Sequence, residues 1–208
     1  MPKVVDHEAR RIQVADAVQE LITEQGLDRV TMARTAAVAG VSVGHVQHYF
    51  PSKDDMLLFT HARVVGKVLD RVSELGARAT RQQLPIRDVV VEGLAEWLPA
   101  DPRRRSAHRV VLAFLGRTVD NPRLAEAHAG TGRHIRELLA TAIHNGKECG
   151  EVPAATDPAR AALELHSLTE GLALQLGSDP AAATAQSTQD LLAARVATVF
   201  SGRCRQYG

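Results

Sequence analysis

Hydrophobic residues recur every three to four positions along nearly the whole chain, and this spacing most constrains how the chain can fold. Val14, Val18, Leu21 and Ile22 form the first such stripe. A spacing of three and four places these side chains on one face of an α-helix. No segment shows the strict alternation of hydrophobic and polar residues that a half-buried β-strand needs. The sequence therefore predicts an all-α fold.

Capping and turn residues divide the chain into about nine expected helices. Gly26 ends the first helix, and Gly146, Gly177 and Gly202 are expected to end three later ones. The other expected helices cover residues 32–39, 43–50, 53–78, 86–98, 102–119, 123–145, 159–176 and 181–200. The first three helices are predicted to form a DNA-binding domain over residues 1–51. Residues 52–208 are predicted to form a larger helical domain for ligand binding and dimerisation.

A tight turn joins the second and third expected helices. Thr31 and Ser42 are suited to cap their first turns, and Gly40 lies between them. Two short helices around such a turn are typical of a helix-turn-helix, whose second helix enters the major groove of DNA. The window from Arg29 to Lys53 contains basic residues and no Asp or Glu, although the net charge of the whole chain is only +1.

The third helix has two different faces at about 100° per residue. Val46 and Phe50 share the face expected in the core, and His48 points the opposite way. Gln47 is suited to read adenine, and Val43 to contact a thymine methyl group. Ser42, Tyr49 and Lys53 suit phosphate oxygens. So do Thr31 and Arg34 at the preceding helix. The candidate DNA-binding residues are Thr31, Arg34, Ser42, Val43, Gly44, His45, Gln47, His48, Tyr49 and Lys53.

Other kinds of site find little support in the sequence. His45 and His48 have the spacing of two metal ligands, but no third ligand lies near them, so no metal site is expected. The motifs of serine hydrolases, zinc proteases, phosphate-binding loops and dinucleotide-binding folds are missing, so neither an enzyme nor a bound cofactor is expected. Cys149 and Cys204 are expected to be free thiols. Without a signal peptide or an apolar run of ~20 residues, the protein is expected to be cytoplasmic and not bound to a membrane.

The segment "TMARTAAVAGVSVGHVQHYFPSKDDML" resembles the DNA-binding segment of TetR-type transcriptional repressors. The resemblance depends on Thr31, the "AGVS" turn, Gly44, Phe50 and the "SKxxM" that follows the helix. It implies a homodimer that binds a palindromic operator in double-stranded DNA and is released by a small-molecule inducer. Three residues depart from the family pattern. Thr35 replaces an aliphatic core residue, and Val43 and Gln47 replace residues that usually face DNA.

The segments "EWLP", "VVLAFLGRTVDNPRLAEAHAG" and "EGLALQL" are similar to the regulatory domain of the choline-responsive branch of these repressors. If that similarity extends to the ligand, Trp97 and Phe114 would surround a cation. Core packing accounts for these two aromatic residues equally well. The candidate effector-binding residues are Trp97, His108, Phe114, Leu115, His166 and Glu170.

The last two expected helices carry a wide stripe of small and aliphatic residues. A pair of such helices from each subunit would form a four-helix dimer core, although packing within one chain is the alternative. The stripe consists of Ala161, Ala162, Leu165, Leu168, Leu172, Leu176, Leu191, Leu192, Val196 and Val199. The leading hypothesis is thus a homodimeric, ligand-responsive repressor. The alternative is a helical small-molecule-binding protein or enzyme that does not bind DNA.

Overall fold

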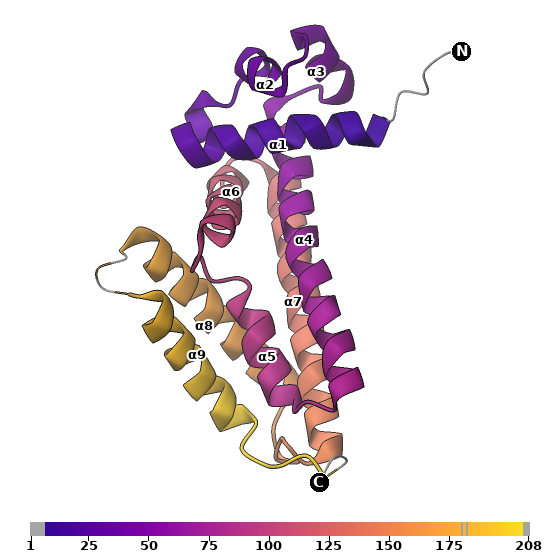
Figure 1. Ribbon diagram of the computed structural model, residues 1–208, viewed down its shortest axis with the longest axis vertical. Helices are drawn as coiled ribbons and strands as arrows, with labels where there is room; N and C mark the ends of the chain where they lie inside the picture. The colour runs from indigo at the N-terminus through magenta and orange to yellow at the C-terminus, as the bar shows by residue number, and fades with distance from the viewer. Residues whose placement is uncertain (1–6, 180, 182, 206–208) are drawn as a thin grey trace. The chain divides into compact units, whose positions relative to one another are not determined.

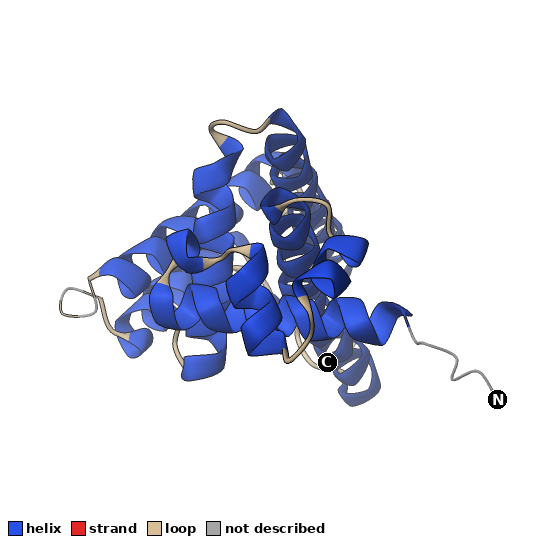
Figure 2. Ribbon diagram, turned by 90° about the horizontal axis from the view of Figure 1, so that it is seen from above, coloured by secondary structure: helices blue, strands red, loops and turns tan. Residues whose placement is uncertain are grey.

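The computed structural model describes residues 7–179, 181 and 183–205, and every regular element in these ranges is a helix (Figure 2). This confirms the predicted all-α fold. The α-helices, labelled in Figure 1, are α1 (His7–Gln25), α2 (Met32–Ala39), α3 (Val43–Tyr49), α4 (Lys53–Gln82), α5 (Ile86–Ala95), α6 (Pro102–Thr118), α7 (Pro122–Cys149), α8 (Pro158–Ser178) and α9 (Ala185–Val199). A short 3₁₀ turn (Leu27–Arg29) lies between α1 and α2. None of these helices is both long and apolar enough to cross a membrane.

The turn between α2 and α3 has the predicted capping. The side-chain oxygen of Thr31 accepts a hydrogen bond from the backbone N–H of Arg34, and that of Ser42 accepts one from His45. Gly40 ends α2 with a φ of 66°. This left-handed conformation costs an L-residue with a side chain far more than it costs glycine. A glycine at this position therefore lets α3 begin with only three residues between it and the end of α2.

The chain divides into two compact units, which we describe separately. Among the described residues, unit 1 contains residues 7–66 and 109–128, and unit 2 contains 67–108 and 129–205 with the gaps at 180 and 182. In unit 1, α1 packs against α2, and α2 packs against α3. Val18, Val46 and Leu57 come from three different helices of this unit and are fully buried. The predicted functional boundary between residues 51 and 52 stays a prediction.

Unit 2 has its own hydrophobic core, to which α5, α7, α8 and α9 contribute. Ile143, Leu165 and Leu192 are fully buried there. Most of the stripe predicted on α8 and α9 belongs to this single-chain core, including Ala161, Ala162, Leu165, Leu176, Leu192, Val196 and Val199. The large hydrophobic residues that α8 and α9 expose are Leu163, Leu174 and Leu191, and of these only Leu191 belongs to the predicted stripe.

Several helix ends differ from the sequence-based expectation, and Gly146 shows why. It was expected to end α7, but the helix continues to Cys149. A Cβ atom on Gly146 would lie 2.7 Å from the side chain of Val152 and 2.9 Å from that of Phe200. Gly146 is thus a close-packing residue inside the helix, and the chain turns instead at Gly150, where φ is 95°. Glycine composition alone does not distinguish these two uses.

The start of α9 was also wrong in the sequence-based expectation. The helix begins at Ala185 and not at 181, because Thr184 and Ser187 form a capping box there. Each side-chain oxygen accepts a hydrogen bond from the backbone N–H of the other residue. The usual capping box has Glu or Gln in the second position, so a serine there is easily missed.

Candidate nucleic-acid interface and ligand pocket

Helix α3 has a hydrophobic face that is buried in unit 1 and an opposite face that is exposed and mostly polar. Val46 and Phe50 are buried in unit 1, as the helical wheel predicts. The opposite face exposes Val43, Gly44, Gln47 and His48. A Cβ atom on Gly44 would meet nothing within 4 Å, so the surface there is flat and open. The helix can therefore lie against another surface without losing the side chains that hold it in place.

Tyr49 is less free than its neighbours on α3. Its hydroxyl group lies 3.2 Å from Nδ1 of His7, a residue of α1. Its ring makes edge contacts with the rings of His7, His45 and His48. Tyr49 and His45 are half-buried as a result. The participation of His7 was missed, because no spacing rule connects two residues 42 positions apart.

All five of the predicted phosphate-binding residues, including the cap Ser42 and Tyr49 beside His7, already have hydrogen bonds within unit 1. Arg34 donates to the side chain of Gln25 at 2.7 Å, and Thr31 caps α2. The Lys53 ammonium group donates to the backbone carbonyl of Leu27 at 2.8 Å. An ammonium group has three N–H bonds, so Lys53 has further donors for a second acceptor. These contacts fix the position of the side chains before any partner arrives.

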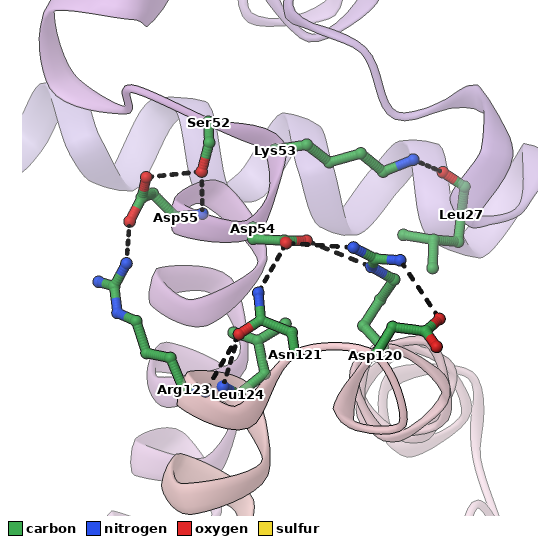
Figure 3. A network of polar contacts seen from close by, with 10 residues as sticks. Leu27, Ser52, Lys53, Asp54, Asp55, Asp120, Asn121, Arg123 and Leu124 are labelled. Carbon is green, nitrogen blue, oxygen red and sulfur yellow. Dashed lines mark hydrogen bonds and ion pairs between the residues drawn. The ribbon is translucent and has the colours of Figure 1, made fainter.

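The first turn of α4, directly after α3, is bound to the end of α6 and the start of α7 (Figure 3). Asp54 accepts hydrogen bonds from Arg117 at 3.1 Å and from Asn121 at 2.8 Å. Asp55 accepts one from the hydroxyl of Ser52 at 2.6 Å and one from Arg123 at 2.6 Å. Both aspartates lie in the first turn of α4, where capping alone could explain them, but both also have partners more than 60 positions away in the sequence.

These contacts keep both aspartates charged. The hydrogen bond from Arg117 is the largest influence that holds the pKa of Asp54 below its ordinary value. The hydrogen bond from Ser52, followed by that from Arg123, lowers the pKa of Asp55. Arg117, near the end of α6, is the ion-pair partner of Asp54. These contacts connect the first turn of α4, which follows α3, to the turn between α6 and α7.

Phe114 and His61 form a second buried contact in unit 1. Their rings are stacked with centroids 3.9 Å apart and an interplanar angle of 15°. Burial, with a smaller contribution from His128, lowers the pKa of His61 to about 4. His61 is therefore neutral at neutral pH. Phe114, predicted to bind an effector, is fully buried against His61, and Leu115 beside it is exposed.

An apolar cavity of about 100 Å³ lies in unit 2 between α4, α5 and α7. Trp97, the only tryptophan of the chain, lines it together with aliphatic residues such as Leu69, Leu94 and Leu139. The cavity is small compared with the several hundred Å³ that drug-sized ligands usually occupy. It can hold only a small group unless its walls move apart.

The polar residues predicted to orient an effector lie elsewhere in unit 2. His166 is buried on α8, and its Nε2 atom is 3.7 Å from the exposed carboxylate of Glu170. His108 lies against Gly177, where a Cβ atom would be 3.0 Å from the imidazole ring. Burial lowers the pKa of His108. Of the six predicted effector-binding residues, only Trp97 lines the apolar cavity.

The helical fold, the tight α2–α3 turn and the exposed polar face of α3 define a helix-turn-helix DNA-binding regulator. Residues 15–58 match the family described as bacterial regulatory proteins of the tetR family, and residues 86–201 match the BetI-type transcriptional repressor C-terminal family. The chain belongs to the TetR family of transcriptional regulators, with a C-terminal region of the BetI type. Its relatives are regulators, which confirms the prediction that it is not an enzyme.

Curated relatives cover most of the chain. The regulator PksA of Bacillus subtilis is 32% identical over 181 residues, which span 86% of this chain and 84% of that protein. The regulator BetI of Burkholderia thailandensis is 31% identical over 180 residues, or 84% of this chain and 85% of its own. The predicted resemblance to the choline-responsive branch is thus confirmed at the level of the family.

Solved structures share the fold over nearly the whole length. A transcriptional regulator from Rhodococcus sp. Rha1 has a TM-score of 0.79 and 27% identity, covering 92% of this chain and 96% of that one. A regulator from Saccharomonospora viridis, solved in complex with choline, has a TM-score of 0.75 and 23% identity, covering 89% and 93%. Because the Saccharomonospora viridis regulator is only 23% identical, its similarity shows a shared fold and nothing further.

Proposed function

We propose that the protein is a homodimeric repressor that binds a palindromic operator with α3 of each subunit and leaves DNA when a small molecule binds. The observation that carries this proposal is the exposed face of α3, with Gln47 and His48 above the buried anchor Val46 and Phe50. The groove of B-DNA admits one such helix, and base edges are read from its exposed side chains. The family membership supports the same role.

The residues on and around α3 divide into readers and anchors. Gln47 can make a bidentate contact with adenine, and Val43 can contact a thymine methyl group. The proposed phosphate contacts come from Thr31, Arg34, Ser42, Tyr49 and Lys53. Phosphate contacts set the register of the protein on DNA without reading the sequence. Because Arg34 and Lys53 are already held by Gln25 and Leu27, they lose little side-chain freedom on binding.

The geometry of α3 supports the proposed dimer. One α3 reaches only a few base pairs, and two copies related by a twofold axis read two half-sites one helical turn apart. The exposed leucines of α8 and α9 offer a surface for this contact, since Leu163, Leu174 and Leu191 are 52%, 46% and 58% exposed in the single chain. We place the dimer interface on this face.

The effector proposed here is a small apolar or quaternary ammonium compound that enters the cavity beside Trp97. An indole ring attracts a cation that lies over its face. The Saccharomonospora viridis neighbour was solved with choline, which suggests the class of compound to test first. An effector releases DNA only if it binds the conformation that cannot bind DNA more tightly than the one that can.

The test is a gel-shift titration on the DNA upstream of the protein's own gene and on randomised sequences, at several salt concentrations. Gln47→Ala should relax sequence preference, with a cost of about 1–3 kcal/mol on the preferred operator. Lys53→Ala should weaken all sequences alike and reduce the salt dependence. Gln186→Ala, an exposed glutamine of α9, is the matched control. Equal effects of the first two variants on every sequence would refute the division into readers and anchors.

Effector release is measured in the same assay. Addition of a small quaternary ammonium compound should dissociate the wild-type complex. Trp97→Ala should still bind the operator but respond to higher concentrations only. A variant that loses both operator binding and response would show that Trp97 serves the fold and not the effector.

A further inference from the structure

Two cysteines and a glutamate from separate parts of the chain meet in unit 2. Cys149 is the last residue of α7, Glu151 follows in the turn, and Cys204 belongs to the segment after α9. Their ligand atoms, two sulfurs and a carboxylate oxygen, all lie within 4.8 Å of one another. The spacing of the cysteines in the sequence does not suggest this meeting.

Backbone contacts hold the three residues together. The N–H of Gly202 donates to the carbonyl of Glu151 at 2.8 Å, and the N–H of Arg205 donates to that of Cys149 at 2.8 Å. The segment after α9 thus returns to the end of α7 (Figure 1). A Cβ atom on Gly202 would lie 2.1 Å from the carbonyl oxygen of Gly150, so only glycine allows this approach. The position of Cys204 beside Cys149 is therefore built into the fold.

Glu151 is a buried carboxylate with a fixed orientation. It is 3% exposed, and its two oxygens accept hydrogen bonds from the backbone N–H groups of Ile86 and Arg87, each at 2.9 Å. Metal-binding carboxylates are commonly oriented by such outer hydrogen bonds. The thiol of Cys149 also donates to Glu151, with a sulfur–oxygen distance of 3.6 Å. The carboxylate is thus held in position, with one of its oxygens next to the Cys149 sulfur.

We propose that Cys149, Glu151 and Cys204 form a binding site for a thiophilic divalent cation of the zinc class. Zinc prefers four ligands in a tetrahedron and accepts thiolates and carboxylates together. With sulfur at about 2.3 Å, its ligand atoms are roughly 3.5–3.8 Å apart, which small side-chain rotations reach from the observed arrangement. An open pocket of about 420 Å³ is lined by both cysteines and provides access for the ion and a water as fourth ligand.

The glutamate distinguishes this cluster from a simple pair of thiols. A disulfide would use the two sulfurs and leave the buried carboxylate without a role in the cluster. A cation bound by the three groups would displace their thiol protons. The cation would also fix the segment after α9 to the end of α7 within unit 2.

The first experiment titrates the reduced, metal-free full-length protein with Zn²⁺ against a chromogenic chelator, and separately with Co²⁺. We expect one ion per chain, with the thiolate-to-cobalt absorption and the visible bands of tetrahedral Co²⁺. Zinc should also raise the melting temperature, since a ligand that binds only the folded state stabilises it. If no ion binds, or if cobalt gives no thiolate absorption, the proposal is wrong.

Variants locate the ion. Cys204→Ser, at a half-exposed position, should weaken zinc binding by at least about 10-fold, and Glu151→Gln should weaken it as well. Cys204→His should retain binding, because imidazole is also a zinc ligand. Glu148→Gln, a nearby exposed carboxylate that also lines the pocket, is the matched control and should bind like the wild type. Zinc binding that is unchanged in Cys204→Ser, or a Cys149–Cys204 disulfide formed with peroxide in a protein that binds no zinc, would overturn the proposal.

Discussion

Thr35 is a polar residue in a position of α2 that is fully buried. It is 0% exposed, and its hydroxyl has no hydrogen-bond partner among the described residues. The sequence already identified this threonine as a departure from the aliphatic residue usual in the family. A buried hydroxyl that lacks a partner costs free energy, whereas a methyl group of the same shape does not.

Thr35→Val should therefore raise the free energy of unfolding by about 1 kcal/mol. Urea denaturation followed by circular dichroism measures the change. Thr31→Val is the contrasting variant, because the Thr31 oxygen caps α2, and its loss should cost about 1 kcal/mol. A loss of stability in Thr35→Val would mean that its hydroxyl does have a partner, such as a bound water.

His61 makes the stability of unit 1 depend on pH. Folding lowers its pKa from 6.5 to about 4, so the unfolded chain takes up the proton first as the pH falls. Its contribution to stability is complete above about pH 6.5 and is lost progressively toward pH 4. Between about pH 7.5 and pH 5, the free energy of unfolding should fall by on the order of 2 kcal/mol from this residue.

His61→Phe tests this expectation, because a phenyl ring can still stack on Phe114 and cannot be protonated. The measured quantity is the difference in pH dependence between wild type and variant, since burial of His108 acts in the same direction. The variant should lose most of the decrease between neutral pH and pH 5. Identical pH profiles would show that His61 titrates normally in the folded protein.

At the scale of single elements, two glycines of the α2–α3 segment have opposite roles. Gly40 has a positive φ and empty space around it, so an added side chain would strain only the backbone. Gly44 lies inside α3 and also faces empty space, but its backbone is helical. The first glycine is required by the turn, and the second leaves a flat surface where a DNA backbone can approach.

Gly40→Ala should lower the free energy of unfolding by roughly 1–2 kcal/mol, because alanine is strained in the left-handed region. Gly44→Ala should raise it by up to about 1 kcal/mol, since alanine favours the helix. Thermal denaturation gives both values. In a gel shift, Gly44→Ala should nevertheless bind the operator more weakly. A stable Gly44→Ala variant with unchanged affinity would place the DNA away from this part of α3.

The ends of α2 and α3 were predictable from the sequence because caps and turns involve residues only a few positions apart. Thr31, Gly40 and Ser42 were assigned correctly for this reason. The C-terminal end of α7 and the start of α9 were not predicted. Gly146 is buried against Val152 and Phe200, and no local rule reports a contact that tertiary packing creates.

At the scale of the whole molecule, the proposed dimer contact uses the exposed leucines of α8 and α9. Leu163, Leu174 and Leu191 are 52%, 46% and 58% exposed. Because most of the predicted stripe packs inside one chain, an interface here would use Leu163, Leu174 and Leu191, of which only Leu191 belongs to that stripe. This location is more specific than the stripe inferred from the sequence.

Leu191→Glu should weaken dimerisation by roughly 10–100-fold, the cost of failing to bury a leucine side chain. Sedimentation velocity over a range of concentrations measures the monomer–dimer equilibrium. Val119→Glu, at a hydrophobic residue of unit 1 that is 83% exposed, is the control and should dimerise normally. A dimer that tolerates Leu191→Glu would place the interface on another surface.

The sequence by itself determined the helical class, the helix-turn-helix, the two faces of α3 and the family, because periodicity and capping act over one or two helical turns. Only the tertiary structure decided which distant residues meet. Asp54 and Arg117 are 63 positions apart. Cys149 and Cys204 meet because the segment after α9 pairs with the end of α7. Such contacts depend on how helices pack, and packing is a property of the whole core that no short window of sequence contains.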